Sequence, residues 1–254
     1  MIFPAINLFK FATLISSINL ELYINDKFEV PTNIYSFTIA RDFPEEDLRK
    51  YYNLGNSYLM NAQFDEALEQ FNKALIISPH NSDVLLSRGI VNEKLFKWKD
   101  AIEDYKESNS IIKKRPFSAD DPTCISNLAN AETGLNLWED ALRDYTYAIK
   151  LDPKFIAPQL GRNLVLYELG RKDESLVYFQ NLAKKFPDFP DGQAALAVMQ
   201  FEKGLLSDAS DSWETALEGD SRYLDIDWVQ NIRRWPPSLV ATLQNFIIYL
   251  KSVR

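Results

Sequence analysis

Few side chains in this sequence could do chemistry, and their number limits the reactions that they support. The 254 residues contain one histidine, His80, and one cysteine, Cys124. A lone histidine with a lone cysteine cannot build a zinc site or a Cys-His nucleophile pair, and one cysteine cannot form an internal disulfide. We therefore expect His80 to lie at a solvent-exposed helix end and Cys124 to be a buried free thiol.

Acidic side chains are the other candidates for a reactive site. Asp225 and Asp227 lie close together, but the glycine and the closing glutamate of a calcium loop are missing. Asp100, Glu103 and Asp104 fall on one flank of a helix, where such spacing is ordinary solvation. No glycine-rich phosphate loop occurs. The sequence predicts no catalytic, cofactor-binding or metal-binding residue, and a protein that is not an enzyme.

The elements around these residues repeat. Small residues recur at intervals of 34, 40, 34 and 34 residues, at Ala67, Ala101, Ala141, Ser175 and Ala209. An aromatic residue follows each of them, at Phe71, Tyr105, Tyr145, Phe179 and Trp213. A 34-residue period is typical of stacked helical hairpins, in which a small residue lets two helices approach and an aromatic ring fills the adjoining gap. The sequence therefore predicts about five such hairpins.

These positions resemble the tetratricopeptide repeat (TPR) family. The first repeat matches all eight signature positions, at Tyr51, Leu54, Gly55, Tyr58, Ala67, Phe71, Ala74 and Pro79. The second and third keep most of the pattern, whereas the fourth departs furthest, with Arg162 and Asn163 in place of the Leu-Gly pair. The resemblance implies an all-α fold, a right-handed superhelical solenoid of about five hairpins with a C-terminal capping helix. The predicted repeats are about 48-81, 82-115, 122-155, 156-189 and 190-221, between an N-terminal hydrophobic and extended segment, 1-47, and a C-terminal cap and tail helix, 222-254.

Composition narrows the class of partner. The formal net charge is -8 and the sequence pI about 4.9, which argues against nucleic acid, since nucleic acid favours clustered Lys and Arg. A hydrophobic content of 46% suffices for a buried core. Six additional residues between the second and third repeats fall in the stretch KKRPFSADDP, from Lys113 to Pro122, which predicts an exposed loop. Its basic run suits either an acidic partner or a solvated helix end favoured by the helix dipole.

The N-terminal segment leaves alternatives open. Residues 1-20 are apolar around Asn7 and Lys10, too polar at the centre for a convincing transmembrane helix. They lack the basic start of a secretory signal and the arginines of a transit peptide. We weigh a cleaved leader, a membrane-surface or packing segment, and a partly disordered or artefactual terminus. Residues 28-39 are predicted to be extended, and the first repeat helix to start near Pro44.

The C-terminal tail is predicted to contain a short helix that stops near Trp235 and a last helix that opens at the Pro236-Pro237 pair. The last helix is apolar nearly all round, so we expect it to pack on the fifth repeat and to offer another face elsewhere. The tail from Asp227 to Pro237 also resembles that of some plant and algal TPR proteins of the plastid. This second resemblance implies a thylakoid setting; the alternative is a cytoplasmic protein.

The family resemblance also implies which residues face the concave groove, on the first helix of each hairpin. The partner-binding residues predicted in this way are Arg49, Tyr52, Asn56, Leu86, Ile90, Asn130, Leu160, Leu164, Tyr167 and Phe201. They make an apolar and aromatic surface with scattered amides. Such a groove suits an apolar helix or an extended segment of a partner protein.

Two uses of this groove can be compared. Heat-shock co-chaperones of the family hold a C-terminal carboxylate with Lys, Asn, Asn, Lys and Arg. Here only Asn56 matches; Tyr52, Ser87, Thr123 and Asn127 stand at the other positions. A chaperone-tail adaptor is therefore not expected. The leading hypothesis is a noncatalytic interaction scaffold or assembly factor. The alternative is a structural subunit of a larger, membrane-associated complex that docks through the N-terminus and the last helix.

Overall fold

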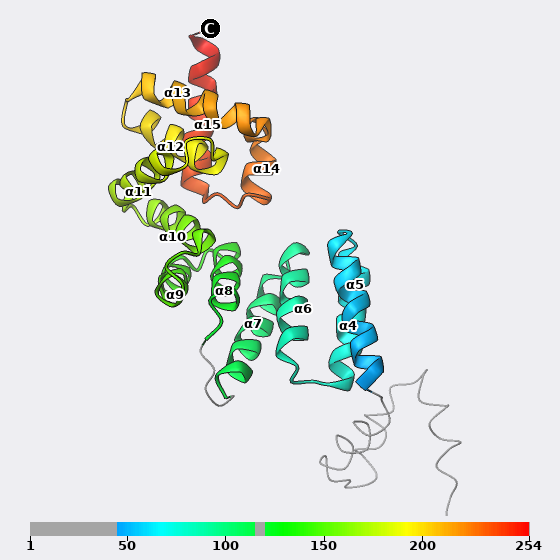
Figure 1. The fold of residues 1–254 in the computed structure, drawn as a ribbon. Coiled ribbons are helices and arrows are strands. Elements are labelled where there is room, and N and C mark those ends of the chain that lie inside the picture. Colours follow the sequence, from blue (N-terminus) through cyan, green and yellow to red (C-terminus); the bar gives the residue numbers. More distant parts are fainter. Residues whose placement is uncertain (1–44, 115–119, 254) are drawn as a thin grey trace, which may run out of the picture.

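The computed structural model describes residues 45-114 and 120-253, and every regular element in these ranges is a helix (Figure 1). The predictions for residues 1-20 and 28-39 lie outside the described residues. Ten helices form five antiparallel hairpins that follow one another along a curved path. The pairs are α4 (Glu45–Met60) with α5 (Phe64–Ile77), α6 (Ser82–Lys94) with α7 (Trp98–Lys113), α8 (Pro122–Gly134) with α9 (Trp138–Leu151), α10 (Ile156–Glu168) with α11 (Lys172–Lys185), and α12 (Pro190–Glu202) with α13 (Leu206–Gly219).

The hairpin turns repeat one backbone device. The residue at each turn has a left-handed φ, at Ala62, Phe96, Asn136, Gly170 and Gly204. The next residue donates its N–H to a carbonyl of the preceding helix, as Lys97 does to Asn92 at 2.8 Å. This hydrogen bond satisfies one of the backbone carbonyls that have no partner within the helix at its C-terminal end. The turn positions keep the 34, 40, 34, 34 spacing of the small residues, so the period of the sequence is the period of the fold.

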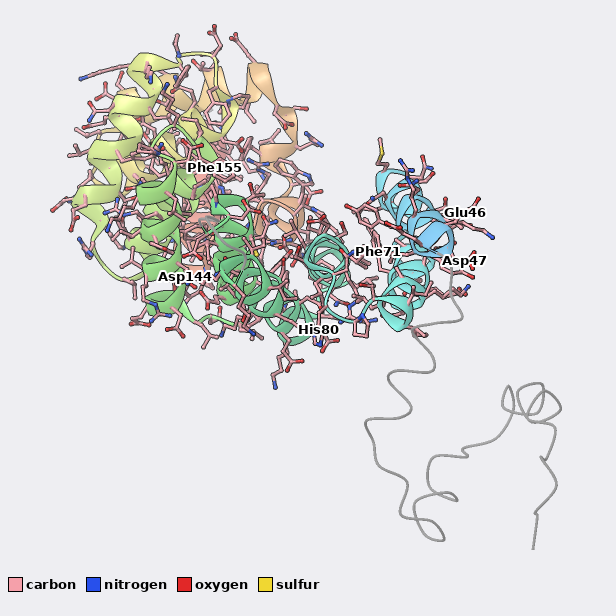
Figure 2. All side chains as sticks on the ribbon, turned by 60° about the horizontal axis from the view of Figure 1, so that its bottom comes forward. Glu46, Asp47, Phe71, His80, Asp144 and Phe155 are labelled. Atoms are coloured by element: carbon pink, nitrogen blue, oxygen red, sulfur yellow. The ribbon has the colours of Figure 1, made fainter. Side chains whose placement is uncertain are left out.

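Small residues are buried between the helices, and in the first two hairpins a glycine lies directly against an aromatic ring. The Ala67, Ala101, Ala141 and Ala209 side chains are fully buried. A Cβ at Gly89 would lie 2.6 Å from the Tyr105 ring, so a larger residue there would force the two helices apart. Phe71 has the same relation to Gly55, and its ring lies in the first hairpin as Figure 2 shows.

The sequence predicted an exposed loop from Lys113 to Pro122; residues 115-119 lie outside the described residues, and the described part of the segment is only partly exposed. Lys113 and Lys114 are exposed at the end of α7, where a positive charge is favoured. Asp120, in contrast, is buried: it accepts a hydrogen bond from the Tyr147 hydroxyl and lies 3.2 Å from the Lys113 ammonium. Asp121 then caps α8 by accepting the Thr123 N–H at 2.9 Å. Asp120 is buried because Tyr147 and Lys113 bind its carboxylate next to the start of α8.

The chain after the fifth hairpin forms a 3₁₀ helix, η1 (Ser221–Leu224), and two α-helices, α14 (Ile226–Asn231) and α15 (Pro237–Ser252). The short helix was predicted to stop near Trp235, which is wrong: it ends at Asn231. Arg234 has a φ of +55°, and the Trp235 N–H reaches back to the Val229 carbonyl at 3.2 Å. This left-handed closure ends the helix before the two prolines do.

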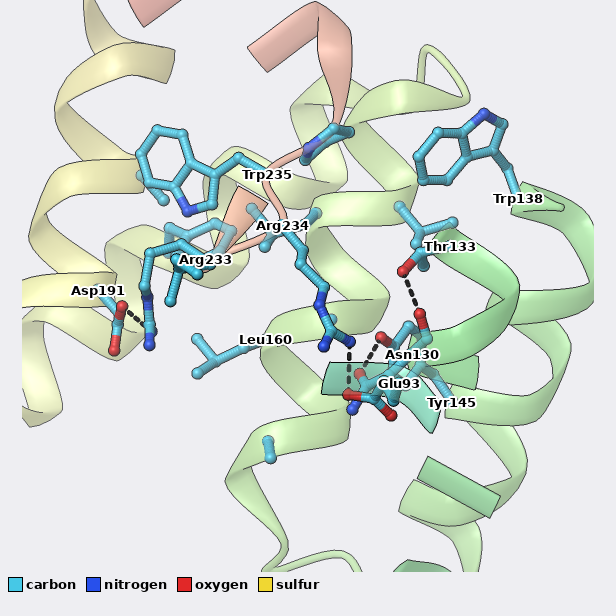
Figure 3. Close-up of a pocket in the computed structure, with 18 of the residues that line it drawn as sticks. Glu93, Asn130, Thr133, Trp138, Tyr145, Leu160, Asp191, Arg233, Arg234 and Trp235 are labelled. Carbon is cyan, nitrogen blue, oxygen red and sulfur yellow. Dashed lines mark hydrogen bonds and ion pairs between the residues drawn. The ribbon is translucent and has the colours of Figure 1, made fainter. Parts of the chain in front are cut away.

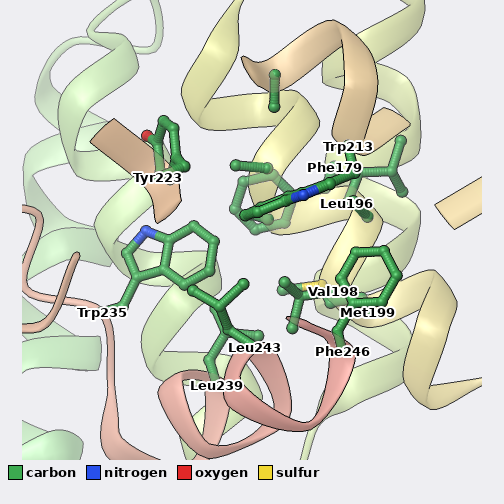
Figure 4. Packing of buried hydrophobic residues seen from close by; sticks show 14 of the residues in the cluster. Phe179, Leu196, Val198, Met199, Trp213, Tyr223, Trp235, Leu239, Leu243 and Phe246 are labelled. Carbon is green, nitrogen blue, oxygen red and sulfur yellow. The ribbon is translucent and has the colours of Figure 1, made fainter. Parts of the chain in front are cut away.

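The largest apolar cluster lies at the C-terminal end (Figure 4). Leu239, Leu243 and Phe246 of α15 are fully buried in it, against Trp213 and Met199 of the fifth hairpin. Helix α15 packs on α12, as expected, and also on α10. It therefore lies along the first helices of the fourth and fifth hairpins, which are the helices predicted to line the groove.

Candidate functional site

The first helices of successive hairpins share one side of the molecule, and the segment between α14 and α15 crosses it (Figure 3). A cavity of about 280 Å³ lies beside the crossing. The first helices α6, α8, α10 and α12 supply most of one wall, with Trp138 and Tyr145 of α9 and Phe179 of α11 behind them, and Ile232 to Pro236 supply the other. The groove thus contains a stretch of the chain's own backbone, with side chains that reach into both ends of the cavity.

Glu93 of α6 and Arg234 of the crossing segment form the ion pair at one end of the cavity. The Arg234 Nη1 lies 2.5 Å from the Glu93 Oε1, while the Tyr105 hydroxyl donates to the other carboxylate oxygen at 3.0 Å. Glu93 is only 7% exposed. The guanidinium also lies 4.9 Å from the Trp98 ring centre, a distance at which a cation and an aromatic face attract. Burial, and then the Glu93 carboxylate, raise the pKa of Tyr105, which keeps that hydroxyl a donor.

Asp191 of α12 forms the second ion pair, with Arg233. Its carboxylate accepts hydrogen bonds from the Arg233 guanidinium and from the Tyr223 hydroxyl of η1. Two neighbouring arginines of one segment therefore bind carboxylates that lie on the second and fifth hairpins. Arginine suits this geometry because its planar group donates several hydrogen bonds in fixed directions.

Three of the predicted groove residues line the cavity: Asn130, Leu160 and Leu164. The Asn130 side-chain oxygen accepts a hydrogen bond from the Tyr145 hydroxyl at 2.6 Å, which orients the amide at the wall of the cavity. The Thr133 hydroxyl donates to the backbone carbonyl of Asn130 at 2.7 Å. The two leucines are half-buried and give the wall its apolar part.

The predicted residues of the first two hairpins lie in a more open stretch. Arg49 and Tyr52 line a second cavity, of about 620 Å³, between the starts of α4 and α6. Asn56, Leu86 and Ile90 are partly exposed, and both apolar side chains rest on the cluster around Tyr105. The crossing segment does not line this second cavity.

Tyr167 and Phe201, the two remaining predicted residues, contact the chain's own last helix. Tyr167 is 1% exposed; its hydroxyl donates to the Glu202 carboxylate at 2.9 Å and lies 3.0 Å from the Thr242 hydroxyl. The Phe201 ring stacks on Phe246 with centroids 4.9 Å apart. The repeat pattern tells which face of a hairpin these residues occupy, but it carries no information about what covers that face. Direct contact of the ten predicted residues with a partner stays a prediction.

Sequence reasoning missed the contribution of Arg233 and Arg234. Asp191 and Glu93 occupy groove positions by repeat phase, but the expectation of an apolar surface gave them no role. The available signal was the pair of arginines between Trp228 and the Trp235-Pro236 step, in a chain whose other charges are mostly acidic. Neither arginine belongs to the repeat, so no periodic argument places it.

The candidates for chemistry each have their own contacts within the fold. His80 lies at the outer end of the first hairpin (Figure 2), with its Nδ1 3.0 Å from the exposed Glu107 carboxylate. Cys124 is fully buried, its thiol donates to the Tyr105 carbonyl at 3.3 Å, and burial raises its pKa to about 12. Asp225 caps α14 by accepting the Trp228 N–H at 3.1 Å. Among the described residues, no group of His, Cys, Asp and Glu is placed to hold a metal ion.

No helix within residues 45-114 and 120-253 has the length and apolar character needed to cross a bilayer. Helix α15, which was expected to be apolar nearly all round, has three fully buried side chains in the C-terminal cluster. Its apolar residues are therefore largely used inside the molecule.

Comparison with protein families identifies tetratricopeptide repeats at residues 49–81 and 164–188. These stretches fall in the first and fourth hairpins, and the fourth is the one whose signature residues depart furthest from the family. The chain therefore contains TPR repeats. No curated protein sequence matches the chain significantly.

Solved structures share the fold at low sequence identity. PilF of Pseudomonas aeruginosa matches with a TM-score of 0.59 and 18% identity, over 82% of this chain and 92% of its own. TTC0263, a TPR protein of Thermus thermophilus, matches with 0.56 and 21%, over 79% and 99%. YrrB, described as a TPR protein with an unusual peptide-binding site, matches with 0.54 and 17%, over 75% and 94%. The predicted all-α helical solenoid is confirmed.

Proposed function

We propose that the chain is a noncatalytic scaffold or assembly factor that holds a segment of a partner protein along its concave groove. The observation that carries the proposal is the open cavity of about 620 Å³ between α4 and α6, lined by Arg49 and Tyr52. Its volume falls within the range of about 300 to 1,000 Å³ that is usual for ligand pockets. The lining is mixed: Leu48, Tyr52 and Val84 form its apolar and aromatic part, and its charged and polar part consists of Glu45, Glu46, Arg49, Asn81 and Asp83. Such a lining suits an extended or helical segment that carries both apolar and polar side chains.

The partner segment would run from this cavity past Asn56, Leu86 and Ile90 toward Asn130. Leu160 and Leu164 continue the same face beside the crossing segment. Tyr167 and Phe201 would act indirectly, by fixing α15 against the fourth and fifth hairpins. The proposed interaction surface is therefore centred on the first three hairpins.

The test compares two substitutions of similar size on opposite sides of one hairpin stack. Leu86→Gln places an amide in the proposed groove, and Ile76→Gln places one on the exposed side of α5, where Ile76 is solvent-exposed. After crosslinking in the native cells, peptides attached to Lys50 or Lys94 would be identified and quantified by mass spectrometry. We expect the Leu86 variant to lose about 90% or more of these crosslinks, as a cost of about 1.4 kcal/mol weakens binding tenfold.

The matched variant Ile76→Gln should keep the crosslinks, and both variants should retain the wild-type circular dichroism spectrum. Equal crosslinking of a folded Leu86→Gln variant would contradict the groove assignment. Because Leu86 is half-buried, the circular dichroism signal and the thermal midpoint of the Leu86→Gln variant must be measured first.

A structural subunit that docks through its last helix is the second candidate, and one observation favours it. Ile248 of α15 is 65% exposed, and Leu250 of the same helix lines, with Leu217, a separate cavity of about 480 Å³. Deletion of residues 238-254 would remove core side chains, so the point variant Ile248→Gln is the sharper probe. If Ile248→Gln lost the crosslinks to partner peptides and Leu86→Gln kept them, the chain would dock through α15. The thylakoid setting that the tail resemblance implies stays a prediction.

A further inference from the structure

The two ion pairs across the groove carry an inference about the chemistry of the partner, which rests on the proposed function. We infer that Glu93 and Asp191 form a recognition site for an extended segment with two adjacent arginines. The chain's own Arg233 and Arg234 occupy this site as an intramolecular ligand. A partner with the same chemistry would bind by taking over the two carboxylates.

The Glu93 position has the features of a site built for a guanidinium. Its carboxylate is buried and held on one oxygen by the Tyr105 hydroxyl, so the other oxygen faces the groove and the Arg234 Nη1. The Trp98 ring offers a flat face to the same group. An ionised buried carboxylate is stabilised by a charged partner. A guanidinium suits this place better than an ammonium, because its planar group can stack on the ring while its N–H groups point at the carboxylate.

The Asp191 position has the same three kinds of group, although only Asp191 lies on the fifth hairpin, while Tyr223 of η1 and Trp228 of α14 belong to the tail. The Trp228 ring also has the Arg222 guanidinium 4.6 Å from its centre. The carboxylate binds Arg233 and is held by the Tyr223 hydroxyl. The Arg233 guanidinium lies 5.7 Å from the Trp228 ring centre. Each site thus combines one acidic group, one tyrosine hydroxyl and one indole ring, which is a specific requirement for two arginines of an extended chain.

The intramolecular ligand fits imperfectly, which leaves room for a competitor. Arg234 has a φ of +55°, a left-handed conformation that non-glycine residues rarely adopt and that strains the backbone. Its buried Nε has no hydrogen-bond partner within the described part of the chain, and the cavity of about 280 Å³ adjoins it. Ile232, just before the two arginines, is 61% exposed. A partner segment that places its guanidinium without the left-handed residue avoids these costs.

Covalent attachment favours the internal segment in the wild-type chain, because a short tether gives an effective concentration of the order of millimolar. The site is therefore best tested after both internal arginines are removed. The full-length variant Arg233→Ala/Arg234→Ala keeps Trp235 and α15 in place and leaves the two carboxylates without their cations.

The probe is a blocked, fluorescently labelled peptide with the sequence of residues 230-236, titrated with the full-length chain and followed by fluorescence anisotropy. We expect the double variant to bind it at least about tenfold more tightly than the wild type does, and binding to weaken with salt. A peptide with lysines in place of both arginines should bind about tenfold more weakly, since lysine lacks the planar donor group.

Substitution of the acidic groups provides the control. Adding Glu93→Gln and Asp191→Asn to the double variant should abolish peptide binding, whereas adding Asp173→Asn, at an exposed carboxylate of α11, should leave it unchanged. Absence of arginine-peptide binding to a folded double variant, or equal binding of the lysine peptide, would overturn the inference. If the double variant does not fold, Arg233→Lys/Arg234→Lys replaces it, with tighter binding than the wild type still required.

The peptide titration and the crosslinking experiment can fail independently, so failure of the arginine site can be told from failure of the proposed function. Loss of crosslinks in Leu86→Gln together with no peptide binding would leave the scaffold standing and remove the arginine site. Peptide binding without any effect of Leu86→Gln would keep the arginine site and move the partner away from the first two hairpins.

Discussion

At the scale of single residues, Glu132 of α8 is the group whose protonation should affect stability. It is 2% exposed, and its Oε2 has no hydrogen-bond partner among the described residues. Burial, and then the nearby Asp144 and Asp140, raise its pKa to about 7, against the smaller opposite effects of Lys106 and Arg143. The folded chain therefore binds the Glu132 proton more tightly than the unfolded chain does. This stabilisation is fully present below the ordinary pKa of 4.5, and it is lost as the pH rises through the folded-state pKa of about 7. We predict that the free energy of unfolding falls by about 2 to 3 kcal/mol between pH 5 and pH 8 from this group.

Glu132→Gln should remove this pH dependence and make the chain more stable than the wild type at pH 8. Urea unfolding at pH 5 and pH 8 measures both effects. Glu139→Gln, at an exposed carboxylate on α9, is the matched control and should leave the pH dependence intact. An unchanged pH dependence in Glu132→Gln would mean that the carboxylate is ionised inside the fold.

At the scale of elements, α15 completes the solenoid. Leu243 is fully buried between the fourth and fifth hairpins, and Ile248 on the same helix is exposed. Leu243→Ala should lower the free energy of unfolding by about 2 to 5 kcal/mol, because it deletes buried methyl groups and leaves a cavity. Ile248→Ala should change it by less than about 0.5 kcal/mol. Chemical denaturation of the two variants tests this, and similar losses for both would show that α15 does not cover the groove.

At the scale of the whole molecule, the Arg234–Glu93 ion pair joins the second hairpin to the C-terminal segment. Solenoid stability comes mainly from contacts between neighbouring repeats, so such a distant contact ties hairpins that otherwise would not interact. A double-mutant cycle with Glu93→Ala and Arg234→Ala should give a coupling energy of about 1 to 3 kcal/mol. The exposed pair Lys73 and Glu69 of α5 is the control, and its coupling should be weaker than that of the Arg234–Glu93 pair because water solvates both exposed ions. Equal coupling in the two pairs would mean that the distant contact does not hold the hairpins together.

The repeating part of the fold could be read from the sequence because it is local. Ala67, Phe71 and their counterparts recur in phase with the left-handed turn residues, and each hairpin needs only its own residues and its neighbours to form. The fourth hairpin still forms, although Ser175 replaces the usual alanine; its hydroxyl donates to the Asn163 carbonyl at 2.7 Å. Helices α10 and α11 pack on each other less closely than the two helices of the other hairpins do, so the deviation in residue type goes with looser packing but not with loss of the hairpin.

Only the tertiary structure shows that α15 and the crossing segment lie against the first helices of the hairpins. The period predicted which faces carry Leu160, Tyr167 and Phe201, but α15 and the crossing segment do not repeat, so no spacing places them. Arg234 meets Glu93 across 141 residues of sequence because the stacked hairpins curve and bring the second hairpin opposite the tail. Local periodicity determined the helices, and the curvature of the whole stack determined which side chains meet in the groove.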